Sequence, residues 1–271
     1  MKLNTLKLVT LTALTLSATT AFANVYDMHK NTPEKQLKAL ANQNDADAIM
    51  ELAYRAEDRK AFKEACQLAE KAVQLGSAKA EQYMGYEYAE NNKCYPKDEE
   101  KGAELTRQAA EKGLSGAQAN LSWYYEKGIG VRKNYKAAVK WAQKAADQNH
   151  TRGQFRLGWL YENGNGVEQS YTKAMEWYKK AADQGNASAQ NNLGVLYEKG
   201  KGANKDTGKA FRYYAMSAKQ GNKYALNNLG WFYEKGIVVD KDLNKAGDYY
   251  SQACDKGYEI ACKNLRWLGR D

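Results

Sequence analysis

The sequence predicts an all-α solenoid built from stacked helix pairs. One 36-residue pattern recurs four times, with leucines at Leu121, Leu157, Leu193 and Leu229. Tyrosines and glycines keep the same step, at Tyr125, Tyr161, Tyr197 and Tyr233 and at Gly128, Gly164, Gly200 and Gly236. A unit of this length cannot bury its own apolar face, so its copies stack and share one continuous core. Such chains present a long surface and are seldom built around one catalytic pocket.

Residues 189–224 show what one copy encodes. Ala189, Leu193 and Leu196 recur at the spacing of one face of an α-helix. Gly200 and Gly202 follow and stop that helix, because glycine adopts the left-handed conformation at a helix end. Second helices then begin at residues whose side chains can accept hydrogen bonds from a first turn, which are Asn134, Ser170, Asp206 and Asp242. The second helix buries Ala210, Tyr214 and Ala218 and ends at Gly221.

This unit resembles the SEL-1-like repeat, a relative of the tetratricopeptide repeat. The match is the pattern A-x-x-x-L-G-x-x-Y-x-x-G-x-G-V followed by K-A, W-Y, K-A-A and G, and it is best in residues 153–188. The resemblance covers residues 117–260 closely and residues 48–116 loosely. It implies a right-handed α/α superhelix whose first helices line a concave face.

About six repeats are predicted, with half-repeat caps. The boundaries are 48–79, 80–116, 117–152, 153–188, 189–224 and 225–260. Residues 24–47 form an N-terminal segment and cap helix, with Thr32 as its cap and Pro33 in its first turn, and residues 261–271 form a C-terminal cap helix. The second repeat has a loop one residue longer, without the glycine pair, and the first repeat has a loop four residues shorter. Atypical ends keep a solenoid soluble.

Residues 1–23 are predicted to be a cleaved signal peptide. Lys2 and Lys7 precede a short apolar run at residues 8–16, and Ala21-Phe22-Ala23 is a cleavage signal. The run is shorter than the roughly 20 residues that span a membrane, so we expect no stable membrane insertion after cleavage. No cysteine stands directly after the cleavage point, which argues against lipidation. The mature chain is predicted to be periplasmic or secreted, and monomeric.

Charge argues against nucleic-acid binding. The formal charge is +9, and +7 once Lys2 and Lys7 are removed with the signal peptide. Basic residues are spread over all repeats and interleaved with acidic ones, whereas nucleic-acid readers concentrate them. We therefore expect a solvated surface with a weak general attraction to anionic partners.

Four cysteines in an exported chain predict two disulfides. Cys254 and Cys262 have the spacing that cysteine-rich SEL-1-like secreted proteins carry in the same register, so the resemblance supports a bridge there. Cys66 and Cys94, in neighbouring repeats, are paired by elimination and proximity. No metal and no cofactor is expected, because His29 and His150 lack ligand spacing to a cysteine.

Most polar residues recur at the repeat period, which argues against an enzyme. Ser170 and Lys173 fit the S-x-x-K motif of serine β-lactamases, and some cysteine-rich relatives have been linked to β-lactam binding or hydrolysis. No S-D-N or K-T-G accompanies the motif, and a helix cap explains Ser170. The periodic glutamates Glu126, Glu162, Glu198 and Glu234 indicate surface or packing roles.

A helical wheel identifies the side of each first helix that faces away from the core. In the resembled superhelix this side lines the concave groove, which implies a binding surface there. The predicted groove residues are Tyr86, Trp123, Phe155, Trp159, Asn191, Val195, Asn227 and Trp231. Tryptophan and tyrosine offer large apolar area with a polar handle, as an extended peptide would need. The alternative is that these rings pack against neighbouring helices.

The sequence therefore predicts a non-enzymatic scaffold that binds another exported or envelope protein or peptide. A narrower form is an immunity protein that neutralises a delivered toxin, or an envelope-assembly factor. The alternative from another class is a β-lactam-binding or hydrolysing enzyme.

Overall fold

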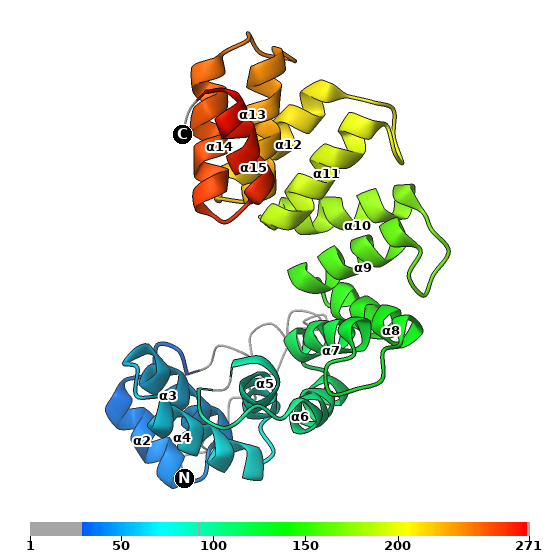
Figure 1. Ribbon diagram of the computed structural model, residues 1–271. Coiled ribbons are helices and arrows are strands. Elements are labelled where there is room, and N and C mark those ends of the chain that lie inside the picture. Colours follow the sequence, from blue (N-terminus) through cyan, green and yellow to red (C-terminus); the bar gives the residue numbers. More distant parts are fainter. Residues whose placement is uncertain (1–28, 92, 270–271) are drawn as a thin grey trace, which may run out of the picture.

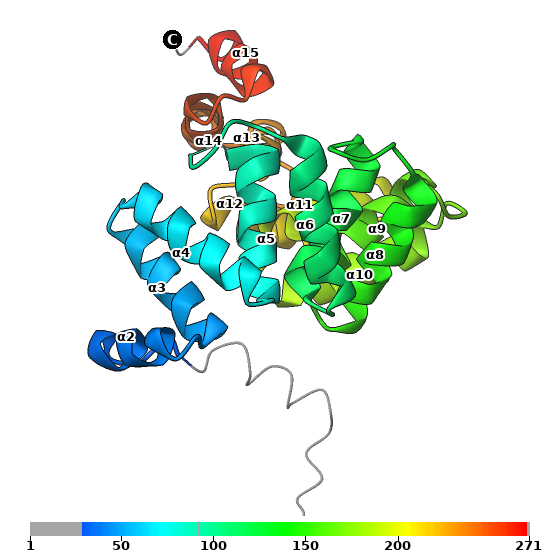
Figure 2. The same ribbon diagram turned by 90° about the horizontal axis from the view of Figure 1, so that it is seen from below.

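The computed structural model describes residues 29–91 and 93–269, and this part of the chain is an all-helical solenoid, as predicted. It contains fourteen α-helices, one π-helical turn and no strand. Consecutive helices pack on one another in chain order, and Figure 1 shows them following an arc. Seen from below, α5–α10 stand in front of α11 and α12, with α2 and α15 at opposite ends (Figure 2). The predicted signal peptide lies outside the described residues.

The helices alternate between first and second members of a pair. Their bounds are α2 (Glu34–Asn42), α3 (Ala46–Asp58), α4 (Phe62–Gln74), α5 (Ala78–Tyr86), the π-helical turn η1 (Glu87–Asn91), α6 (Glu99–Glu111), α7 (Ser115–Lys127), α8 (Tyr135–Asp147), α9 (Thr151–Asn163), α10 (Tyr171–Asp183), α11 (Ala187–Lys199), α12 (Thr207–Lys219), α13 (Lys223–Lys235), α14 (Leu243–Asp255) and α15 (Glu259–Trp267). No helix in the described ranges is long and apolar enough to cross a membrane.

The helix ends follow the predicted signals. The Asp206 carboxylate accepts a hydrogen bond from the Lys209 amide at 2.8 Å, and Asn134, Ser170 and Asp242 cap their helices in the same way. Gly200 ends α11 in the left-handed conformation, with φ of 66°. The first helices α11 and α13 begin two residues before the predicted repeat boundaries, because Asn186 and Asn222 cap them.

In the last three repeats, one buried tyrosine joins the two helices of a pair. Tyr178, Tyr214 and Tyr250 are fully buried. Each ring lies against a glycine of the preceding helix, and a Cβ at Gly194 would come within 2.6 Å of the Tyr214 ring. The Tyr214 hydroxyl donates to Glu198 Oε2 at 2.6 Å, and Tyr178 and Tyr250 donate to Glu162 and Glu234. These three periodic glutamates therefore have packing roles.

The second predicted repeat departs from the others where its loop lacks glycines. Helix α5 runs directly into η1, and α6 begins only at Glu99. A π-helical turn accommodates an extra residue within a helix, so the insertion is absorbed before the loop begins. Gly85 and Gly102 let α5, η1 and α6 approach closely, because a Cβ on Gly102 would lie 2.7 Å from the Gly85 carbonyl oxygen.

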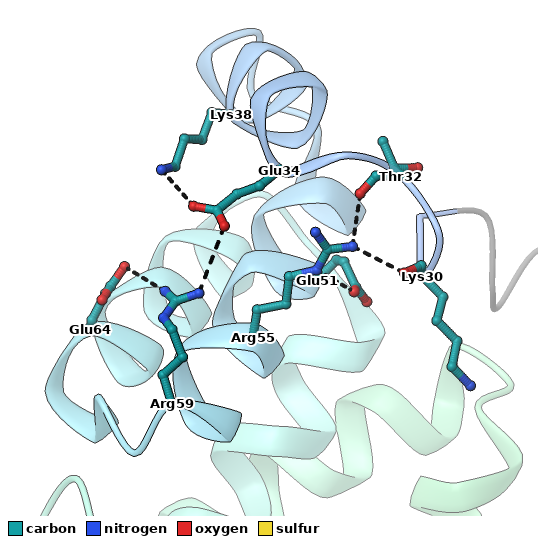
Figure 3. A network of polar contacts seen from close by, with 8 residues as sticks. All are labelled: Lys30, Thr32, Glu34, Lys38, Glu51, Arg55, Arg59 and Glu64. Carbon is teal, nitrogen blue, oxygen red and sulfur yellow. Dashed lines mark hydrogen bonds and ion pairs between the residues drawn. The ribbon is translucent and has the colours of Figure 1, made fainter.

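Arg55 fastens the N-terminal segment to α3. Its Nη2 donates to the carbonyl oxygens of Thr32 at 2.8 Å and Lys30 at 3.0 Å, while its Nε donates to Glu51 (Figure 3). The prediction that Thr32 caps the first helix is wrong. Pro33 occupies the N-cap position of α2, no side chain caps the helix, and the Thr32 carbonyl is engaged by Arg55 instead.

Both predicted disulfides are present, Cys66–Cys94 and Cys254–Cys262. The first joins α4 to the loop after η1, across a Cα–Cα distance of 6.0 Å. The second joins α14 to the terminal helix α15, and the Cα atoms of its two cysteines are 4.8 Å apart. Within the described residues no free cysteine is left. Cys66, Cys94 and Glu87 lie together. Because the two sulfurs are bonded to each other in the disulfide, they are not available as metal ligands.

Candidate interaction surface

The predicted aromatic line has one residue on each of five first helices. These residues are Tyr86 on α5, Trp123 on α7, Trp159 on α9, Val195 on α11 and Trp231 on α13, and all but Val195 are aromatic. None of these five side chains is buried. Tyr86 and Trp231 are exposed, at 43% and 36% of their full surface, while Trp123, Trp159 and Val195 are half-buried. By contrast the next residue along each helix is fully buried, as Tyr124, Leu160 and Phe232 are.

Successive first helices approach one another on this side. Helix α7 contacts α9 directly, although α8 separates them in the chain. Side chains of neighbouring first helices also hydrogen-bond to each other, as in Asn264 to Asn227 at 3.0 Å and Asn228 to Asn191 at 3.3 Å. Elements on the inner side of a curved stack lie closer together than those outside, so we identify this side as the concave face.

The three other predicted groove residues also contact neighbouring helices. Asn191 is buried and accepts its hydrogen bond from Asn228 of the following first helix. Asn227 is half-buried beside Asn264. Phe155 is half-buried, with its ring centroid 5.7 Å from that of Tyr178. In the free chain these residues thus take part in contacts between helices.

Two of the predicted tryptophans are linked by a basic residue that sequence reasoning missed. Lys127 Nζ lies 4.4 Å from the ring centroid of Trp123 and 5.8 Å from that of Trp159. The Arg156 guanidinium lies 4.4 Å from the Trp123 ring centroid. We call Trp123, Lys127, Arg156 and Trp159 the cationic cluster.

A departure from the repeat pattern gives this region its own polar contacts. Ala142 stands where the later repeats carry Tyr178, Tyr214 and Tyr250, so Glu126 has no tyrosine partner at that position. Arg156 stands in the register of Asn192 and Asn228. Glu126 instead forms an ion pair with Lys127 at 2.9 Å and accepts a hydrogen bond from Arg156 Nη1 at 3.4 Å. The interrupted periodicity was the sequence signal that could have revealed the cluster.

Electrostatics differ between this region and the later repeats. Burial and the adjacent carboxylate raise the pKa of Tyr178 and of Tyr214 far above the usual range, so both hydroxyls remain donors. Around Arg156, burial is the main cause that lowers the guanidinium pKa to about 10, and nearby Arg152 adds to it. Glu126 and Glu90 oppose this shift. Arg156 is therefore a partly desolvated cation.

Ser170 is held as a helix cap. Its Oγ accepts from the Lys173 amide at 3.3 Å, while Lys173 Nζ lies over the Tyr161 ring, 5.3 Å from its centroid. The lysine of the S-x-x-K motif thus points to an aromatic ring.

Replacing Ser170 with alanine should lower the free energy of unfolding by about 1 kcal/mol, because one first-turn amide loses its acceptor. Asp206→Ala removes the equivalent cap of α12 and is the matched control. Denaturant unfolding checks both losses. A nitrocefin assay of the same variants checks the chemistry, and hydrolysis that disappears only in Ser170→Ala would contradict the assignment as a cap.

Comparisons with known proteins identify the repeats. The model of the Sel1 repeat matches residues 78–114, 115–150, 151–186, 187–222 and 223–258. These residues are more than half of the chain, and the chain therefore belongs to the Sel1 repeat family. The pair α3 and α4 lies before the matched residues and packs as the later pairs do. Among curated proteins, no sequence matches.

Solved structures of other Sel1 repeat proteins have the same fold. The c5321 protein, a protective antigen of uropathogenic Escherichia coli, is 33% identical over 88% of this chain, with a TM-score of 0.75. The matched part is 52% of c5321, so this chain spans about half of that protein. A Sel1 repeat protein from Oxalobacter formigenes is 31% identical over 80% of this chain and 88% of its own, with a TM-score of 0.74.

The immunity protein Pa5087 from Pseudomonas aeruginosa shares the fold alone. It is 22% identical over 71% of this chain and 74% of its own, with a TM-score of 0.50. Sel1 repeats mediate protein–protein interaction.

Proposed function

We propose that this chain is an exported, monomeric and non-enzymatic scaffold that binds an extended segment of another exported or envelope protein on its concave face. The observation that carries the proposal is the line of incompletely buried aromatic residues on four of five successive first helices. A soluble chain gains stability by covering large apolar rings, so rings left open along one face indicate a surface for a partner. Export is supported by the apolar N-terminal segment and by two disulfides, which persist in oxidising compartments.

Trp159→Ala should weaken partner binding by about 2 kcal/mol or more while leaving the fold nearly intact, because a central aromatic anchor carries a large share of binding energy. The partner is first isolated with the mature chain from an envelope extract, and affinity and melting temperature are then measured together. Tyr178→Ala, a change in the core of the same repeat, is the control for lost packing. A large fall in melting temperature for Trp159→Ala, or unchanged affinity, would remove Trp159 from the groove.

In one narrower form of the proposal, this chain is an immunity protein whose partner is a toxin delivered to the periplasm. In another, this chain is an envelope-assembly factor. The likeness to Pa5087 concerns the fold and supports neither form by itself. Co-expression with candidate toxins tests the immunity proposal. An immunity protein restores the growth of cells that express its toxin, and the Trp159→Ala variant of this chain should restore less growth.

The competing proposal is a protein that binds or hydrolyses β-lactams. It predicts nitrocefin turnover by the mature chain that Ser170→Ala abolishes. The scaffold proposal predicts no turnover by either protein.

A further inference from the structure

The cationic cluster marks the one place along the aromatic line, within the described residues, where two basic side chains contact the same tryptophan. Both Lys127 and Arg156 lie 4.4 Å from the Trp123 ring centroid. A cation over an aromatic face is attracted by the ring, and the ring also holds it in place. The two positive groups are thereby fixed beside the apolar surface that the proposed function uses.

The cluster carries excess positive charge. A single carboxylate, that of Glu126, serves both Lys127 and Arg156. Arg152 and Glu90 also influence Arg156 and cancel each other in formal charge. One positive charge is therefore left over in the group.

Arg156 is also incompletely hydrogen-bonded. Its side chain is only 13% exposed, and its Nε donates to no acceptor in the described part of the chain. A buried donor without a partner costs free energy, and a carboxylate is the acceptor that matches a guanidinium best. Lys127, at 44% exposed, can turn toward an incoming group without unfolding the helix.

We propose that the cationic cluster is a subsite for an acidic side chain, so that the segment bound on the concave face carries Asp or Glu next to an apolar residue. This inference rests on the proposed function and names the chemistry of its partner. The carboxylate of the bound segment would balance the positive charge of Lys127 and Arg156 that Glu126 does not neutralise. The apolar neighbour would cover the rings of Trp123 and Trp159. A side chain is assigned rather than a chain terminus, because the aromatic line continues on both sides, at Tyr86 and at Trp231, and the segment passes through.

Repeat periodicity supplies a matched control. Lys199 occupies the register of Lys127 on α11, but Val195 replaces the tryptophan and Asn192 replaces the arginine. Lys199→Gln removes the same charge from the same position without touching the cluster. Both lysines are exposed, so neither change should disturb folding.

The test is selection of a random short-peptide library, displayed on phage through the peptides' C-terminal ends, against the mature chain. Because those ends are covalently occupied, acidic enrichment can come only from side chains. We expect Asp or Glu to be enriched beside apolar residues with wild type and Lys199→Gln, and the enrichment to disappear with Lys127→Gln. For a selected peptide, Lys127→Gln should weaken affinity roughly tenfold.

Glu126→Gln gives a second readout of opposite sign. Removing the competing carboxylate frees both cations, so affinity for the selected acidic peptide should rise. Enriched peptides that are apolar but not acidic, or acidic enrichment that survives Lys127→Gln, would overturn the subsite while leaving the groove intact. Absence of any selected peptide, or selected peptides that bind Trp159→Ala unchanged, would instead contradict the proposed function.

Discussion

Replacing Tyr214 with alanine is expected to lower the free energy of unfolding by about 3–5 kcal/mol, as removal of a large buried ring commonly does. The ring is fully buried between α11 and α12 and lies edge-on to Phe232, with 5.8 Å between ring centroids. Its loss also leaves Glu198 without the hydroxyl that donates to it. Denaturant unfolding followed by circular dichroism measures the change.

Tyr213→Ala is the control for Tyr214→Ala. Tyr213 is the preceding residue and is only half-buried, stacked on Tyr197 at a centroid distance of 5.8 Å. Its replacement should lower the free energy of unfolding clearly less than Tyr214→Ala does. Equal losses in the two variants would show that the tyrosine–glutamate pair is not what joins the two helices of a repeat.

Removal of the Cys66–Cys94 disulfide, by replacing both cysteines with alanine, should cost about 3–4 kcal/mol. In the chain-entropy account, a bridge stabilises by restricting the unfolded chain, and the gain grows with the closed loop. This bridge spans 28 residues in sequence. Cys254–Cys262 spans 8, so its removal should cost less, about 2–3 kcal/mol.

Equilibrium unfolding of the two double variants checks that order. Hydrogen exchange also shows where the chain is destabilised, because α15 should lose protection first when Cys254–Cys262 is removed. A larger loss for the shorter loop would show that native packing, rather than loop length, sets the value of these bridges.

Periodicity was enough to predict most of the fold. The leucines, the stop glycines and the cap residues recur at one step, and each acts within a single helix or turn, so their roles can be deduced without tertiary information. The caps at Asn134, Ser170, Asp206 and Asp242 and both disulfides are confirmed. Thr32 was misassigned because its carbonyl binds Arg55, a residue of the next helix.

The candidate surface could be predicted only in part. A helical wheel treats each first helix alone, and it therefore placed Asn191 on open surface, although Asn228 of the following first helix covers it. It also could not show that Lys127 reaches the Trp159 ring of another helix, because that distance depends on how closely α7 approaches α9. Ala142 and Arg156 were visible as breaks in the repeat, but their consequence for Glu126 required the packing.

Site-specific photo-crosslinking tests most directly whether the concave face binds a partner. A photoreactive phenylalanine analogue replaces Trp159 in one variant and the exposed Lys179 of α10 in another, and both are irradiated with the purified partner. We expect an adduct from position 159 and none from position 179. Adducts from position 179 alone, with partner affinity unchanged in both variants, would contradict it.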